Sequence, residues 1–209
     1  MTNGHVNWLI MPLGYQPITK RCPSCETKKL FLPSGTFRVN AQKKTLDVWN
    51  IYKCEKCDYT WNIDIHERIN TNKLDPDVHQ RYLHNDLDEV RRHAYDYSLL
   101  KRNNAELGPT PPYDILGPSP YALSGVEQLS ITIDFEQVIP VRLINILTRK
   151  LCLSRSQVAR LLDEGVLVGL TPADLNRKIK HSLTLHLNLA RLYQLDLPFV
   201  NTPADVEVS

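Results

Sequence analysis

Two short stretches, CPSC at residues 22–25 and CEKC at residues 54–57, hold four of the five cysteines of this chain. Each Cys-x-x-Cys turn can place two sulfur atoms at two corners of a tetrahedron, and two such turns complete the four-thiolate shell of structural zinc. Because all four ligands then come from the protein, no position stays open for a catalytic water. The spacing therefore predicts one structural zinc ion, whose ligands are Cys22, Cys25, Cys54 and Cys57.

The alternative is that the same residues form redox-active or disulfide-bonded pairs. A redox Cys-x-x-Cys normally stands alone between a strand and a helix, whereas strand-forming residues flank both pairs here. Zinc is therefore the favoured interpretation. Free thiols in metal-type spacing suit a reducing compartment, and the remaining Cys152 has the character of a small buried residue.

Alternating apolar residues around the cysteines predict an antiparallel zinc ribbon with flanking strands over residues 1–70. Residues 6–11 are expected to form a first strand beside the ribbon, and a Pro-Ser-Gly turn at residues 33–35 should separate two later strands. Four aromatic residues could stack nucleic-acid bases, but in so small a ribbon we expect them to form its core. They are Trp49, Tyr52, Tyr59 and Trp61.

After the ribbon, the period of the apolar residues changes from two to about 3.6. A segment of central amphipathic helices is therefore predicted over residues 71–107, with helix starts at Asp75 and at Asn85 or Asp86. The charged run at residues 91–93 is expected to lie on a solvated face.

Proline and glycine are concentrated at residues 108–127 and predict a linker or an ordered wrap-around segment, because proline fixes the backbone and removes a hydrogen-bond donor. Residues 128–209 then form a third part, with an alternating strand at residues 129–135 followed by helices. The predicted fold class is α+β: an N-terminal antiparallel zinc ribbon, central amphipathic helices and a C-terminal small α/β module.

The C-terminal module has a distinctive local sequence. Ser154 and Gln157 form a capping box at the start of a helix over residues 155–164, and Gly165 takes the position of a left-handed C-cap. With their neighbours, residues 140–170 resemble the alpha-L RNA-binding motif named after small-subunit ribosomal protein four. The resemblance implies phosphate contacts with structured RNA by Arg142, Arg149, Ser154, Arg155, Ser156 and Arg160.

Positive charge is concentrated in the same region. The chain carries a formal net charge of +2, but between Pro140 and Arg191 nine Lys and Arg residues and three acids give +6. The other 16 basic and 20 acidic residues leave the rest of the chain at −4. This distribution of a basic module beside a mildly acidic body agrees with an RNA partner.

The whole chain also resembles a bacterial family, domain of unknown function 1062, which is described as containing a zinc ribbon and linked to nucleic-acid binding. The residues that carry this resemblance surround the expected ligands: RCPSC at 21–25, VWNIYKC at 48–54 and TWN at 60–62. The resemblance implies the metal site and the architecture, and it implies no particular activity.

Two functions fit these features. The first is a cytoplasmic, non-enzymatic, zinc-binding protein that contacts ribosomal or transfer RNA. The alternative is a zinc-ribbon adaptor that binds a protein partner through Trp8, Trp49 and Trp61. No enzyme and no small-molecule substrate are inferred, because the chain has no Gly-rich phosphate loop, His-Glu-x-x-His or nucleophile elbow. A membrane role is not expected either, since no leader and no apolar run of about 20 residues is present.

Overall fold

The computed structural model describes residues 2–195 and 197–198 of the 209-residue chain. The chain divides into two compact units, one formed by residues 14–111 and the other by residues 1–13 together with 112–209. We call the first the ribbon unit and the second the sheet–helix unit. Asp196 and residues 199–209, which end the predicted module 128–209, lie outside the described residues.

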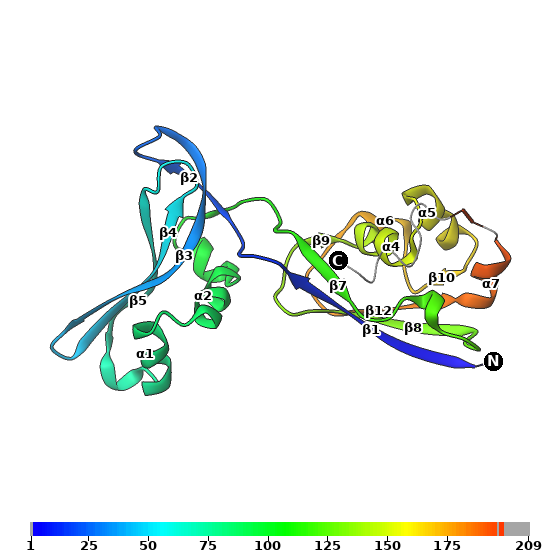
Figure 1. Cartoon of the computed structure of the whole chain (residues 1–209), viewed down its shortest axis with the longest axis horizontal. Coiled ribbons are helices and arrows are strands. Elements are labelled where there is room, and N and C mark those ends of the chain that lie inside the picture. Colours follow the sequence, from blue (N-terminus) through cyan, green and yellow to red (C-terminus); the bar gives the residue numbers. More distant parts are fainter. Residues whose placement is uncertain (1, 196, 199–209) are drawn as a thin grey trace. The chain divides into compact units, whose positions relative to one another are not determined.

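The ribbon unit is a twisted antiparallel sheet with short helices along one face (Figure 1). Its strands follow the order β5-β4-β3-β2-β6, so consecutive strands pair with one another from β2 to β5. The elements are β2 (Ile18–Cys22), β3 (Thr27–Gln42), β4 (Thr45–Cys54), β5 (Thr60–Asn70), a 3-10 turn (Thr71–Lys73), α1 (Pro76–Leu83), α2 (Leu87–Ala94), α3 (Tyr97–Arg102) and β6 (Glu106–Leu107).

The turn expected at residues 33–35 is wrong, because β3 runs through it as one long strand. The register with β4 shifts between Pro33 and Phe37, which marks a bulge rather than a chain reversal. The bulge lets the helical layer dock on the strand: the backbone N–H of Phe37 donates to Asn85 Oδ1 at 2.7 Å.

The predicted helical segment is confirmed as helical, but it consists of three short helices. Asp75, Asp86 and Asp96 each precede a helix and accept a backbone N–H of its first turn. These aspartate caps satisfy exposed helix N–H groups and stop the preceding helix from continuing. The third start, at Asp96, is absent from the sequence prediction.

The sheet–helix unit contains a five-stranded sheet in the order β10-β12-β8-β1-β7 and a separate two-stranded pair, β9 with β11. Helices α4, α5 and α6 lie on one side of the larger sheet (Figure 1). The elements are β1 (Asn3–Pro12), β7 (Tyr113–Leu116), a 3-10 turn (Pro120–Ala122), β8 (Gln128–Phe135), β9 (Val141–Arg142), α4 (Leu143–Leu151), α5 (Arg155–Asp163), β10 (Leu167–Val168), α6 (Pro172–Asn176), β11 (Lys178–Ile179), β12 (Leu183–Asn188) and α7 (Leu189–Gln194).

The first strand does not lie beside the ribbon, and this expectation is wrong. β1 instead pairs in parallel with β8 and antiparallel with β7, so it becomes an inner strand of the sheet–helix unit. The Pro-rich segment 108–127, expected as a linker or an ordered wrap-around, contains β7, an ordered strand of that sheet. By contrast, the capping box of Ser154 and Gln157 and the left-handed Gly165 are confirmed.

Within the described residues, no helix is long and apolar enough to cross a membrane.

Gly117 should be essential for the sheet–helix unit. Its φ is +120°, and a Cβ added there would lie 2.2 Å from the backbone oxygen of Asn7 on β1. Gly117→Ala should therefore lower the free energy of unfolding by more than about 2 kcal/mol, since strain and overlap with backbone act together. Gly125→Ala is the control, because Gly125 also has positive φ (+75°) but open space around it.

Urea unfolding followed by amide hydrogen exchange of β8 would measure both variants and separate this unit from the ribbon unit. Equal destabilisation by the two substitutions would contradict the close contact at Asn7.

Candidate functional site

The four cysteines sit on two turns built to the same plan. Cys22 ends β2 and Cys54 ends β4, and the second cysteine of each pair follows three residues later. The next residue, Glu26 or Asp58, has φ near +57° and turns the chain back into the following strand. This repeated backbone geometry points both pairs of sulfurs out of their turns toward a shared centre.

The four sulfur atoms lie within 4.8 Å of one another, and the Sγ atoms of Cys22 and Cys57 are 3.5 Å apart. A tetrahedral ion with metal–sulfur bonds of ~2.3 Å places its sulfurs ~3.8 Å apart, so the cluster needs only small adjustments to bind one. In the part of the chain that the structure describes, Cys152 is not in this group. The four cysteines could therefore hold a metal ion, as their spacing predicts.

The protonation of the cluster is uneven. A hydrogen bond to Cys57, together with burial, raises the pKa of the Cys25 thiol to about 12. The backbone N–H of Tyr59 stabilises the Cys57 thiolate and lowers the pKa of Cys57 to about 6. One sulfur is thus ready to bind a cation, while others must release protons as a metal binds.

The cluster is continuous with the apolar core of the ribbon unit. Cys22 and Cys54 are fully buried and pack in the same core as Phe31 and Tyr52. Of the four aromatic residues expected in this core, Tyr52 is fully buried, Trp49 and Trp61 are half-buried, and Tyr59 is exposed. Two of the four candidate ligands, Cys22 and Cys54, are therefore also core residues, so a change at the cluster would disturb the packing of the unit.

The residues expected to contact RNA lie on α4 and α5 and immediately before them. Arg142 and Arg155 are exposed, and Arg155 donates to Asn145 Oδ1 at 3.0 Å. Arg149 donates to the Tyr113 carbonyl and lies 3.6 Å from Asp114.

The other three residues of that set already have partners. Arg160 forms an ion pair with Glu164 at 2.6 Å. Ser154 caps α5 and lies 3.0 Å from the hydroxyl of Ser156. These groups are thus partly engaged within the helix that carries them.

The tryptophans expected as adaptor anchors are mostly covered. Trp8 is fully buried, and its indole N–H donates to the Pro118 carbonyl at 3.1 Å. Trp61 lies under the ammonium group of Lys20, 3.3 Å from the ring centroid. The structure thus places one of the three anchors inside a core and partly covers a second.

The structure contains a buried polar cluster on α2 that the sequence does not predict. Glu89 and His93 on α2 are each 4% exposed, although residues 91–93 are expected on a solvated face. Glu89 is held by Arg81 at 3.1 Å and Arg92 at 2.6 Å, and Tyr82 lies 3.0 Å from His93 Nε2.

The solvated-face expectation is therefore wrong for His93. Because Arg92 can only donate, its contact of 3.1 Å with His93 Nε2 makes that nitrogen an acceptor. Burial, aided by the charge of Arg92, lowers the pKa of His93 to about 3. The Asp86 cap in the sequence marks where α2 begins, but which face of this short helix turns inward depends on its packing.

Removing one sulfur should unfold the ribbon unit. Cys57→Ser is the cleanest change, because Cys57 is exposed and its loss leaves no cavity. We expect loss of bound metal and collapse of β4 and β5, since a structural metal contributes about 10 kcal/mol or more to folding. Metal content by mass spectrometry and amide exchange of β4 would measure both effects.

Cys152→Ser is the matched control and should keep its metal, because Cys152 lies outside the cluster. A metal-free Cys57→Ser protein with a native ribbon would show that the metal is not structural.

His93 should make the ribbon unit sensitive to acid. Its pKa is about 3 when folded and about 6.5 when unfolded, so the unfolded chain binds an extra proton between these values. Stability is therefore complete above pH 6.5 and falls as the pH drops below it. Between pH 7 and pH 5 the wild type should lose up to about 2 kcal/mol more than His93→Gln.

Urea unfolding at the two pH values would test this, and the comparison cancels acid effects on the thiols because both proteins contain them. Parallel losses in the two proteins would mean that His93 does not carry the effect.

Comparison with known proteins links the chain to one family. A family model described as "Protein of unknown function (DUF1062)" matches residues 39–172. This match includes Cys54 and Cys57, the polar cluster on α2, and helices α4 and α5. No curated protein and no solved structure matches the chain. Because the matched segment covers well over half of the 209 residues, the chain belongs to the DUF1062 family.

Proposed function

We propose that this chain is a non-catalytic, zinc-stabilised protein that binds structured RNA in a reducing cytoplasm. Zinc is the proposed ion because four thiolates form the closed, soft ligand set that structural zinc prefers, with no position left for a substrate or water. In this proposal the zinc shapes the ribbon unit, and the RNA contacts belong to the sheet–helix unit.

The observation that best supports RNA binding is a pair of opposed positive charges. Arg142 on β9 lies directly opposite Lys178 on β11, and both side chains are exposed. Neither has a carboxylate partner among the residues that the structure describes. Like charges facing each other across two strands are destabilising. A phosphate bound between them would remove that cost.

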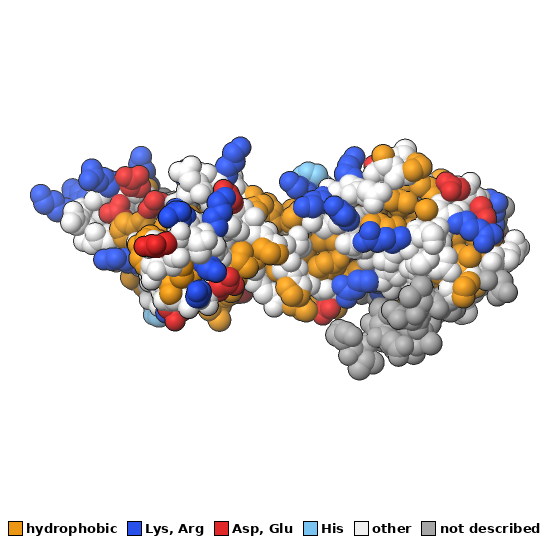
Figure 2. Space-filling model, turned by 90° about the horizontal axis from the view of Figure 1, so that it is seen from above, with side chains coloured by type: hydrophobic (Ala, Val, Ile, Leu, Met, Phe, Trp, Pro, Cys, Tyr) orange, Lys and Arg blue, Asp and Glu red, His pale blue; other side chains and the backbone are white. Residues whose placement is uncertain are grey.

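The same positive surface continues along α4. Asn145 and Arg149 are four residues apart on α4 and so share one helix face, and Arg142 is the N-cap residue immediately before this helix. Asn145 also holds the guanidinium of Arg155 against this face. We call Arg142, Arg149, Arg155 and Lys178 the basic stripe. Figure 2 shows Lys and Arg side chains gathered on the visible face of this unit.

The arrangement suits an RNA backbone better than a base sequence. Arginines present planar sets of donors that can bridge phosphate oxygens, and A-form RNA is recognised mainly by its shape and backbone. Since Arg160 is paired with Glu164, the proposal gives it a smaller part than the basic stripe. Little sequence preference is expected.

Binding of full-length, nucleic-acid-free protein to an RNA hairpin and to a DNA duplex should be measured across a salt series. We expect RNA to bind more tightly, with an affinity that falls as salt rises. Arg142→Gln/Lys178→Gln should weaken RNA binding and reduce the slope of log K against log salt by about 2.

Arg177→Gln/Arg191→Gln is the matched control, because it removes the same charge from exposed residues of the same unit outside the basic stripe. If the protein did not bind RNA, the proposal would be wrong and the protein-adaptor alternative would be favoured. Equal effects of the two double variants would mean that net charge, rather than the basic stripe, attracts RNA.

A further inference from the structure

The ribbon unit has a second candidate site away from its cysteines. Two hollows of about 380 Å³ and about 310 Å³ share the lining residues Ile65, His66 and Arg102. They lie between β5 and the three short helices, and we call them together the β5–α3 pocket. Openings of a few hundred Å³ are the usual size for a small-molecule site.

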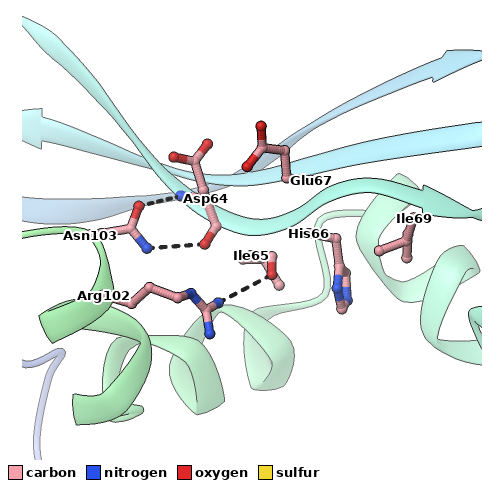
Figure 3. A pocket seen from close by; sticks show the side chains of 7 residues that line it. All are labelled: Asp64, Ile65, His66, Glu67, Ile69, Arg102 and Asn103. Atoms are coloured by element: carbon pink, nitrogen blue, oxygen red, sulfur yellow. Dashed lines mark hydrogen bonds between the residues drawn. The ribbon is translucent and has the colours of Figure 1, made fainter.

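Irregular pairing of β5 creates this pocket. Val48 and Trp49 on β4 are consecutive, yet their partners are His66 and Asp64, so Ile65 is an extra residue in β5. A second shift follows between Val48 and Leu46. Bulges re-aim side chains and leave backbone groups unpaired, and they are common beside binding sites. Here the His66 ring lies on the side of β5 that faces the helices (Figure 3).

The end of α3 is fixed to the bulged strand. The Asn103 side chain accepts from the Asp64 N–H at 2.8 Å and donates to the Asp64 carbonyl at 3.0 Å, as a neighbouring strand would. This clamp positions Arg102, which donates to the Ile65 carbonyl at 3.4 Å (Figure 3). In the described part of the chain Arg102 has no carboxylate partner, so most of its five N–H donors stay available.

The pocket holds one arginine whose charge is not balanced by a paired carboxylate. Arg92 and Arg102 both line it, but Arg92 forms an ion pair with Glu89 at 2.6 Å, whereas Arg102 has no such partner among the described residues. The carboxylates of Asp64 and Glu67 point to the opposite side of β5 (Figure 3).

The one other acid in the lining, Asp96, is occupied as the cap of α3, where it accepts the Leu99 N–H at 2.9 Å. Burial, together with the charges of Arg92 and Arg102, lowers the pKa of His66. The same arginine charges that oppose a proton on His66 would attract a bound anion.

We propose that the β5–α3 pocket binds a small organic anion through a phosphate or carboxylate group. Arg102 supplies the guanidinium fork for the oxyanion, and the His66 ring stands close by as a further donor. Ile65, Ile69 and Leu99 provide apolar surface for the remainder of the ligand. The sequence predicts no small-molecule ligand, so this site is an addition to that expectation. It is independent of RNA binding by the other unit.

The test is a titration of the full-length protein with phenyl phosphate, benzoate and benzyl alcohol at constant ionic strength. The three probes share an aromatic ring and differ in the charged group. Nuclear magnetic resonance signals of Ile65, His66 and Arg102 report binding. We expect saturable shifts below about 10 mM with at least one anion, no saturation with benzyl alcohol, and a rise in the pKa of His66 when the anion is bound.

Which anion saturates the signals distinguishes a phosphate ligand from a carboxylate ligand. Arg102→Gln should weaken binding about tenfold or more, because a charged hydrogen-bond partner is lost. Lys101→Gln, the adjacent exposed residue on α3, removes the same charge without touching the pocket and should bind as the wild type does.

Because Arg102 is exposed, its replacement should leave the fold intact, which dispersed spectra and an unchanged unfolding midpoint would verify. Failure of both anions to saturate the signals, or equal binding by Arg102→Gln and Lys101→Gln, would overturn the proposal.

Discussion

The pairing of β1 with β7 is the constraint on which both units depend. The two strands are antiparallel neighbours, and the Leu13 N–H donates to the Pro112 carbonyl at 2.9 Å. The whole ribbon unit, residues 14–111, is therefore an insertion between two paired strands. Its own ends also meet, because β2 pairs with β6 and the Gly108 N–H donates to the Pro17 carbonyl. When the ends of an insertion already lie together, pairing the two flanking strands loses little additional conformational entropy.

Inside the ribbon unit, a metal held by the cysteine cluster would offset several unfavourable features. Glu26 and Asp58 adopt left-handed backbone conformations, and Glu89 and His93 are buried polar groups. Each of these costs free energy, since positive φ strains a side chain and a buried charge loses its hydration. The helices are too short to be stable alone. A bound metal that joins two strand ends to the core can offset such costs in a unit of this size.

The two units present positive charge in different forms. In the sheet–helix unit the basic stripe is exposed and spread over α4, α5 and β11, a form suited to an extended polyanion. In the ribbon unit, Arg92 and Arg102 instead line a partly open hollow with His66 and apolar side chains. Such a space suits one small anion whose apolar part can be buried. The proposed RNA contacts and the proposed anion pocket thus belong to different units, and either could operate without the other.

By itself the sequence determined the local features: the four cysteines in metal spacing, the aspartate caps at Asp75 and Asp86, the capping box at Ser154 and the left-handed Gly165. Each depends on the chemistry of a few neighbouring residues, so a short stretch is enough to specify it. The partner of β1, more than a hundred residues away along the chain, could not be read in this way.

Tertiary structure alone decided that β1 joins β8, that His93 turns inward and that bulges in β5 place His66 beside Arg102. These outcomes depend on which surfaces meet and on register shifts of single residues, and a strand's own residues do not encode them.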